Sequence, residues 1–259
     1  MSWQRKVGAV IVALVALAAV VSLVWTPYDP LQTEVAARLQ GSSPAHWMGT
    51  DQFGRDIASR VMDGARLTLT VAVGAVALSG LVGVPLGIWA GMRRGASRVV
   101  MAGADLLLAF PALLLAIVFT AVFGASIWIV VLAIGIAGIP AFVRVARAGT
   151  MQVMQRDYIL AARIAKVSGP AIAWRHVLPN IWPLVLTQVS VAVALAILAE
   201  AGLSFLGLGA PAPYASWGRM LQASQPYLAT SPHLALWPGA AIALTVLGFN
   251  LLGNADDRR

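Results

Sequence analysis

The sequence contains no cysteine. Without a thiol the chain can form no disulfide, thiolate zinc site, iron–sulfur cluster or cysteine nucleophile. Its three histidines, His46, His176 and His233, are far apart, and none lies four residues from another. The His-x-x-x-His pattern of a zinc enzyme is therefore missing, and the sequence gives no support to a metalloenzyme.

Charged residues are scarce, at 11% of the 259 residues, whereas hydrophobic residues make up 59%. The mean hydropathy of +0.82 lies outside the range of soluble globular proteins and indicates a membrane protein. A net charge of +8 would suggest a nucleic-acid partner for a soluble protein. Here the basic residues lie between apolar runs, so membrane topology explains them better and we expect no nucleic-acid partner.

Six apolar stretches are long enough to cross a bilayer, whose hydrocarbon core of about 30 Å requires about 20 helical residues. We predict an all-α membrane protein with about six transmembrane helices, at residues 7–25, 67–92, 99–123, 127–143, 181–199 and 234–253. The first stretch follows two basic residues like a signal peptide, but it ends without a small-residue cleavage pattern. We therefore interpret it as a retained helix.

The basic residues predict the orientation of the chain. With a cytoplasmic N-terminus, thirteen of the eighteen Lys and Arg residues fall in inner segments, Arg258 and Arg259 among them, and five in outer segments. This positive-inside bias predicts that both termini are cytoplasmic. We expect an N-terminal helix and outer loop over residues 1–66, and a five-helix core over residues 67–259 with an inner segment at 144–180 and an outer segment at 204–233.

The second predicted span carries glycines at every fourth position, Gly83, Gly87 and Gly91. Such spacing puts small residues on one helix face and permits close approach of another helix. The pattern predicts a tightly packed bundle and says little about cargo. A proline within this face and Pro111 in the third span make kinks plausible there.

Asp105 is the one charged residue inside the predicted spans. An ionisable residue in a span is a functional candidate by default. Asp105 lies only about 9 Å from the inner end, at 1.5 Å per residue, where it can reach interfacial water or pair with Arg98 or another basic residue. We favour a structural role over ion coupling for Asp105, and also for Glu200 at the outer end of the fifth span.

The glycine-rich stretch at 202–209 superficially resembles a nucleotide-binding loop. It follows a membrane helix instead of a strand, so we interpret it as the start of an apolar re-entrant or interfacial segment anchored by Trp217. The sequence contains no Gly-x-x-x-x-Gly-Lys-Ser/Thr loop. If ATP drives this protein, a partner must bind the nucleotide.

The inner segment predicts a cytoplasmic helical hairpin. Asp157 is placed to cap a short helix that runs to Lys166. The segment that starts at Ser168 terminates this helix, and a second short helix follows and reaches Pro179. Small alanines on the first helix would let another protein approach closely, while Arg163 and Lys166 could meet its carboxylates. An amphipathic segment lying on acidic lipid headgroups is an equally good physical interpretation.

Six segments, taken in order, resemble the permease subunits of dipeptide, oligopeptide and nickel ABC importers. They are the outer-loop residues Gly49, Thr50, Asp51, Gly54, Arg55 and Asp56, the third-span motif at 107–111, the coupling motif at 161–163 and 175–180, the exit of the fifth span at 199–209, and the segments 216–218 and 249–253. Each segment alone is weak. Together, in this order, they are specific.

The resemblance implies the type I permease fold of ABC importers, in a bacterial inner membrane. It implies a heterodimer with a sister permease, two ATPase subunits that bind ATP and Mg²⁺, and an extracytoplasmic solute-binding protein. This chain would be no enzyme and would bind no cofactor or metal itself. The resemblance assigns ATPase coupling to Tyr158, Ala161, Ala162, Arg163, Lys166, Gly169, His176 and Pro179.

Two residues depart from the family pattern in the coupling segment. Leu160 stands where the family usually has glutamate, and Lys166 stands where it usually has glycine. We expect Lys166 to raise helix propensity by up to roughly 1 kcal/mol. Because of these two changes, the affinity for the ATPase subunit, or the identity of that subunit, could differ from the family pattern.

The expected function is import of peptides or a similar small solute, with nickel or a metal chelate still open. A secondary transporter driven by an ion gradient would require ionisable residues near the middle of the membrane. A membrane-embedded enzyme would require a convergent catalytic constellation, and none is visible within the spans.

Overall fold

The computed structural model describes residues 3–209, 211 and 213–253, so Arg258 and Arg259 lie outside the described residues. The described chain is helical, with one isolated bridge between Thr50 and Asp56. Its α-helices are α1 (Trp3–Val21), α2 (Ile57–Met92), α3 (Arg94–Leu108), α4 (Ala112–Phe123), α5 (Ile127–Val153), α6 (Asp157–Ile164), α7 (Gly169–Ile172), α8 (Leu178–Phe205), α9 (Trp217–Ser224) and α10 (His233–Gly253). Short 3-10 turns occupy Val35–Ala37 and Gln225–Tyr227.

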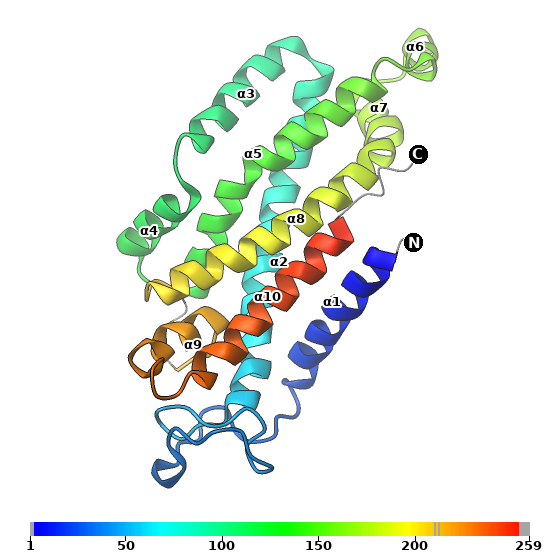
Figure 1. Cartoon of the computed structure of the whole chain (residues 1–259). Coiled ribbons are helices and arrows are strands. Elements are labelled where there is room, and N and C mark those ends of the chain that lie inside the picture. The colour runs from blue at the N-terminus through cyan, green and yellow to red at the C-terminus, as the bar shows by residue number, and fades with distance from the viewer. Residues whose placement is uncertain (1–2, 210, 212, 254–259) are drawn as a thin grey trace.

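The long helices form one bundle (Figure 1). α2 packs most extensively on α5, and α8 contacts α2, α5 and α10, while α1 lies against α10 and α2. The short helices α6 and α7 lie at one end of the bundle, and α9 lies with the loop of residues 26–56 at the other (Figure 1). We call these the α6 end and the α9 end.

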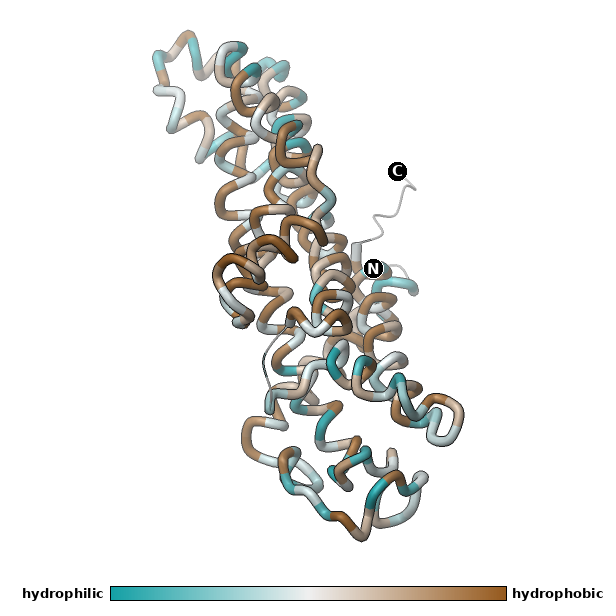
Figure 2. The backbone as a smooth tube through the Cα atoms, turned by 90° about the vertical axis from the view of Figure 1, so that its left-hand side faces the viewer, coloured by the Kyte–Doolittle hydropathy of each residue, from teal (hydrophilic) through white to brown (hydrophobic). Residues whose placement is uncertain are grey.

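Hydrophobic residues line the long helices, and hydrophilic residues gather toward the two ends of the bundle (Figure 2). Five helical segments of the described chain are long and apolar enough to cross a membrane: α1, α2, α5, the segment Gly169–Phe205 and α10. A sixth crossing requires α3 and α4 to act together. This all-helical architecture agrees with the predicted fold class.

The third predicted span is not one continuous helix. α3 ends at Leu108 and α4 begins at Ala112, and the two helices are bent by 79°. Pro111 is the N-cap of α4. Proline lacks an N–H and disfavours helical geometry in the residue before it, so the helix breaks there. The proline inside α2, by contrast, does not interrupt that helix.

α2 and α5 extend beyond their predicted spans. α2 begins at Ile57 because Asp56 caps it, accepting a hydrogen bond from the Ser59 N–H at 2.8 Å. Residue 66 therefore lies inside α2. α5 continues to Val153, so its last turns carry it toward the short helices of the α6 end.

Candidate functional site

The candidate coupling site is the hairpin of α6 and α7 that connects α5 to α8. α6 is a two-turn helix whose N-cap is Arg156. Asp157 is the first helical residue and not the cap, which corrects the sequence prediction. An acidic side chain in the first turn still stabilises the helix, because the N-terminal end of the helix dipole is positive.

Ile159 is the side chain that anchors α6 most deeply, with Ala162 packed beside it on the core. Ile159 is fully buried, whereas its neighbours Tyr158 and Leu160 are 44% and 60% exposed. Ala161 and Arg163 are exposed and Ala162 is half-buried, and Ile164 is 75% exposed, so the outer face of α6 combines alanines and one cation with large apolar side chains. This face is open to a partner protein.

Lys166 ends the α6 helix in a left-handed conformation, with a φ of +55°. The Val167 N–H returns to the Ala162 carbonyl at 3.0 Å, as in a helix stop that normally uses glycine. The expectation that Lys166 raises helix propensity is therefore wrong, because the residue lies beyond the helix. A side chain in this conformation costs about 1–2 kcal/mol.

The second arm of the hairpin is continuous with α8. α7 begins at the half-buried Gly169 and passes through a π-helical turn, Ala173–Val177, directly into α8. The second short helix predicted to stop at Pro179 is thus the start of α8, and Pro179 lies in its first turn, where proline's missing N–H is tolerated. The ring of His176 in the π turn lies 6.1 Å from that of Tyr158, which joins the two arms.

The predicted glycine face of α2 lies directly against α5. A Cβ added to Gly87 would come within 2.6 Å of the Val143 carbonyl oxygen and 2.7 Å of the Ala146 Cβ. One at Gly83 would meet the Phe142 Cβ at 2.6 Å, and one at Gly91 the Thr150 Cβ at 2.6 Å. These positions have no room for a side chain while α2 and α5 keep this separation.

Asp105 of α3 pairs with Arg144 of α5 at 2.7 Å. Its side chain is 60% exposed and that of Arg144 is 52% exposed. The pair therefore links two helices at the protein surface. This geometry matches the alternative that Asp105 pairs with a basic residue other than Arg98.

The outer-loop motif forms an ordered cap on the start of α2. Asp51 accepts hydrogen bonds from the N–H groups of Phe53 and Arg55 at 2.8 and 3.0 Å, and pairs with the Arg55 guanidinium at 2.7 Å. Arg60, 6% exposed, reaches the same carboxylate at 3.6 Å and donates to the Pro30 carbonyl at 3.1 Å. One buried carboxylate thus joins its own loop to α2, and Arg60 in turn joins α2 to the segment at Pro30.

The remaining motif residues close this cap. Asp56 accepts hydrogen bonds from Ser59 and from His46 Nδ1, the latter at 2.9 Å. Thr50 is fully buried and donates to the Ala37 carbonyl. Gly49 and Gly54 turn the chain with φ values of +80° and +76°, which side-chain-bearing residues rarely adopt.

The exit of the fifth span contains a buried acid. Glu200 is 1% exposed and accepts hydrogen bonds from Thr68 at 3.2 Å and Ser204 at 2.6 Å. Trp217 of α9 is also 1% exposed, and its Nε1–H donates to the Val61 carbonyl of α2 at 2.9 Å. Trp217 is therefore a core residue. The prediction that it anchors a segment at the lipid interface is wrong.

The structure divides the predicted residues between two sites. The coupling residues lie at the α6 end, and the motif at 49–56 lies at the α9 end, with the glycine face between them (Figure 1). No sequence pattern indicated Thr68 as a partner of Glu200, because a single threonine in an apolar helix is not distinctive. A spacing of four residues could have indicated Ser204.

Comparisons with known proteins agree with this architecture. Residues 83–255 match the family of binding-protein-dependent transport system inner membrane components. The structure resembles a chain of an amino acid ABC transporter with a TM-score of 0.55, covering 75% of this chain and 91% of that chain at 17% identity. This likeness supports the fold alone.

Curated relatives extend the match along the chain. The dipeptide transport system permease protein of Alkalihalophilus pseudofirmus is 38% identical over 96% of this chain and 82% of its own. The glutathione transport system permease protein of Pectobacterium atrosepticum is 41% identical over 88% and 76%. The nickel transport system permease protein of Escherichia coli is 33% identical over 98% and 92%.

This chain belongs to the family of binding-protein-dependent transport system inner membrane components. It is a multi-pass membrane permease, as its sequence resemblance predicted. Nothing in the fold or in these relatives supports a secondary transporter.

Proposed function

We propose that this chain is one permease half of an ATP-driven importer for small peptides. It pairs with a sister permease, and two ATPase subunits bind ATP and Mg²⁺ and dock on the α6–α7 hairpin at the cytoplasmic side. An extracytoplasmic binding protein delivers the peptide at the α9 end. Both termini are cytoplasmic, in line with the positive-inside bias.

One structural observation carries this proposal: the exposed hairpin lies between two long helices of the bundle. α5 runs into α6, and α7 continues through its π turn into α8. A displacement of α6 by a docked ATPase would therefore be transmitted to both helices. ATP and loaded binding protein need only favour one arrangement of these helices over the other for the populations to shift.

A small cavity lies where such a movement would act. It has a volume of about 180 Å³ and is enclosed by residues of α2, α4, α5 and α8, with Gln188 and Ser79 among its polar lining. We assign it to the solute path, because both helices connected to the hairpin contribute to its wall.

Purification tests the assembly. The tagged chain, extracted from native membranes in mild detergent, should bring with it a second permease and an ATPase, identified by mass spectrometry. A chain that is stable and reproducibly alone would contradict the proposal. Cells lacking the chain should lose uptake of labelled dipeptides. If they lose only the uptake of radioactive nickel, the cargo is nickel and not a peptide.

Charge reversal tests the coupling surface. Arg163→Glu in the purified complex should lower the ATPase activity that the binding protein stimulates, while membrane insertion stays normal. Lys6→Glu, which reverses an exposed cation of α1 outside the hairpin, provides the control for a reversed charge. If the binding protein stimulates ATPase activity normally in the Arg163 variant, Arg163 does not take part in the contact with the ATPase.

A further inference from the structure

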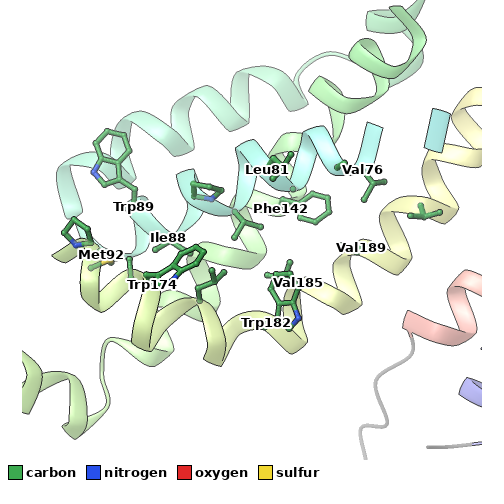
Figure 3. A pocket seen from close by; sticks show the side chains of 18 of the residues that line it. Val76, Leu81, Ile88, Trp89, Met92, Phe142, Trp174, Trp182, Val185 and Val189 are labelled. Carbon is green, nitrogen blue, oxygen red and sulfur yellow. The ribbon is translucent and has the colours of Figure 1, made fainter. Parts of the chain in front are cut away.

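An apolar groove with a volume of about 1020 Å³ lies between α2 and the α7–α8 arm. Figure 3 shows Leu81 and Ile88 on one wall, and Trp174, Trp182 and Val185 on the other. Several side chains of the groove stay open to the surroundings, Leu81 at 77% exposure and Trp182 at 50%. The groove thus opens sideways from the bundle.

The charge of this groove is confined to one end. Arg93, which follows the last residue of α2, is the one charged residue in the lining formed by the described chain. Arg94 and Arg98 follow in the first turns of α3, four residues apart and therefore on one face of that helix. All three arginines are exposed, and none forms an ion pair with a carboxylate among the described residues.

The groove is longer than one membrane leaflet. Its lining on α2 runs from Val73 to Arg93, which is about 30 Å at 1.5 Å per residue. This equals the whole hydrocarbon core of about 30 Å, so a lipid whose headgroup lies at Arg93 would fill the half of the groove next to that residue. Trp89 and Trp174, 49% and 72% exposed, surround the charged end. Tryptophan gathers where acyl chains meet headgroups, so the charged end lies at headgroup depth.

We propose that this groove binds an anionic phospholipid of the leaflet at the α6 end. Its acyl chains lie between α2 and α8, and its phosphate lies at Arg93 with Arg94 and Arg98 nearby. Basic pockets between membrane helices bind acidic headgroups in this way. The proposal requires only that the chain spans the membrane, so it does not depend on the cargo or the ATPase partner.

Photocrosslinking in the purified, reconstituted complex tests the proposal. The probes are phosphatidylglycerol and phosphatidylcholine that carry the same photoactivatable acyl chain, and labelled peptides are mapped by mass spectrometry. We expect phosphatidylglycerol to label the groove-lining peptides of α2 and α8 at least about fivefold more strongly, the preference that one well-placed arginine supplies.

Two groups of variants locate the headgroup and the chains. Arg93→Gln with Arg94→Gln should reduce phosphatidylglycerol labelling to the phosphatidylcholine level, whereas Arg156→Gln, an exposed arginine at the same end but outside the groove, should not. Leu81→Trp should reduce labelling by both lipids by filling the groove, whereas Val99→Trp on the exposed surface of α3 should leave it unchanged.

Three results would overturn the proposal. Equal labelling by the two lipids would show an apolar surface with no headgroup selectivity. Labelling that persists in the double arginine variant would place the headgroup elsewhere. A groove that neither lipid labels in the intact complex would show that a protein partner, such as the sister permease, covers it.

Discussion

Thr68 of α2 donates a hydrogen bond to Glu200 of α8, although the two residues are 132 positions apart in the chain. Ser204, one turn beyond Glu200, donates to the other carboxylate oxygen. The three side chains are buried, so no bulk water replaces a lost partner. The bonds therefore fix α8 to α2 near the α9 end.

Removal of this carboxyl group should destabilise the protein. Glu200→Ala takes the carboxyl partner away from the buried hydroxyl groups of Thr68, Ser204 and Ser216, at a cost of about 1–3 kcal/mol each, and creates a cavity as well. Glu200→Gln retains one acceptor oxygen, and its amide N–H can donate a hydrogen bond to a hydroxyl oxygen. We expect a clear loss of thermal stability in detergent for Glu200→Ala and a small one for Glu200→Gln. Equal melting temperatures for both variants would show that the hydrogen bonds contribute nothing.

Gly87→Leu should separate α2 from α5. The new side chain would collide with the Val143 carbonyl and the Ala146 Cβ, and overpacking of this kind costs about 1–3 kcal/mol. We expect impaired assembly and loss of uptake. Gly103→Leu is the matched control, because open space surrounds that glycine on α3. Unchanged uptake in the Gly87 variant would contradict a tight helix interface.

Lys166→Gly should stabilise the hairpin. Glycine adopts a positive φ without the cost of about 1–2 kcal/mol that a side chain carries. Hydrogen–deuterium exchange of residues 157–168 should become slower. Lys166→Ala removes the charge but keeps the strained backbone, so its exchange should not become slower. If both variants gain protection equally, the charge of Lys166 and not its backbone is responsible.

Asp51→Asn should loosen the cap of residues 26–56. The change removes a charge that holds Arg55 and Arg60, and hydrogen bonds to charged groups contribute about 1.5–3 kcal/mol. We expect faster proteolysis in this loop and a lower melting temperature. Asp63→Asn breaks a more exposed pair with Arg66 and should cost less than about 1 kcal/mol. The prediction fails if the two variants behave alike.

Asp105→Asn should have almost no effect. The ion pair with Arg144 is exposed, and such pairs contribute about 0–1 kcal/mol. Uptake and its dependence on the proton gradient should match those of the unmodified protein. A large loss of uptake would instead show that Asp105 takes part in transport.

Much of the bundle was predictable from local patterns. Apolar runs long enough to span a bilayer identified the membrane helices, because a helix in lipid must satisfy its own backbone. The spacing of Gly83, Gly87 and Gly91 indicated a packing face, and the motifs in order indicated the permease family. Local pattern does not distinguish the break at Pro111 from a tolerated kink, since a proline inside a membrane helix does not always interrupt it, as α2 shows.

Contacts between distant segments could not be read in the same way. The partner of the glycine face, the bond from Thr68 to Glu200 and the burial of Trp217 depend on which helices lie side by side. The left-handed backbone at Lys166 also runs against the preference of its residue type. Sequence alone determined most of the apolar helices and the family, because these follow from local composition, whereas the true ends of α2 and α5 and the break in the third span did not follow from it. Only the tertiary structure decided which buried polar groups meet, because that depends on how the whole bundle packs.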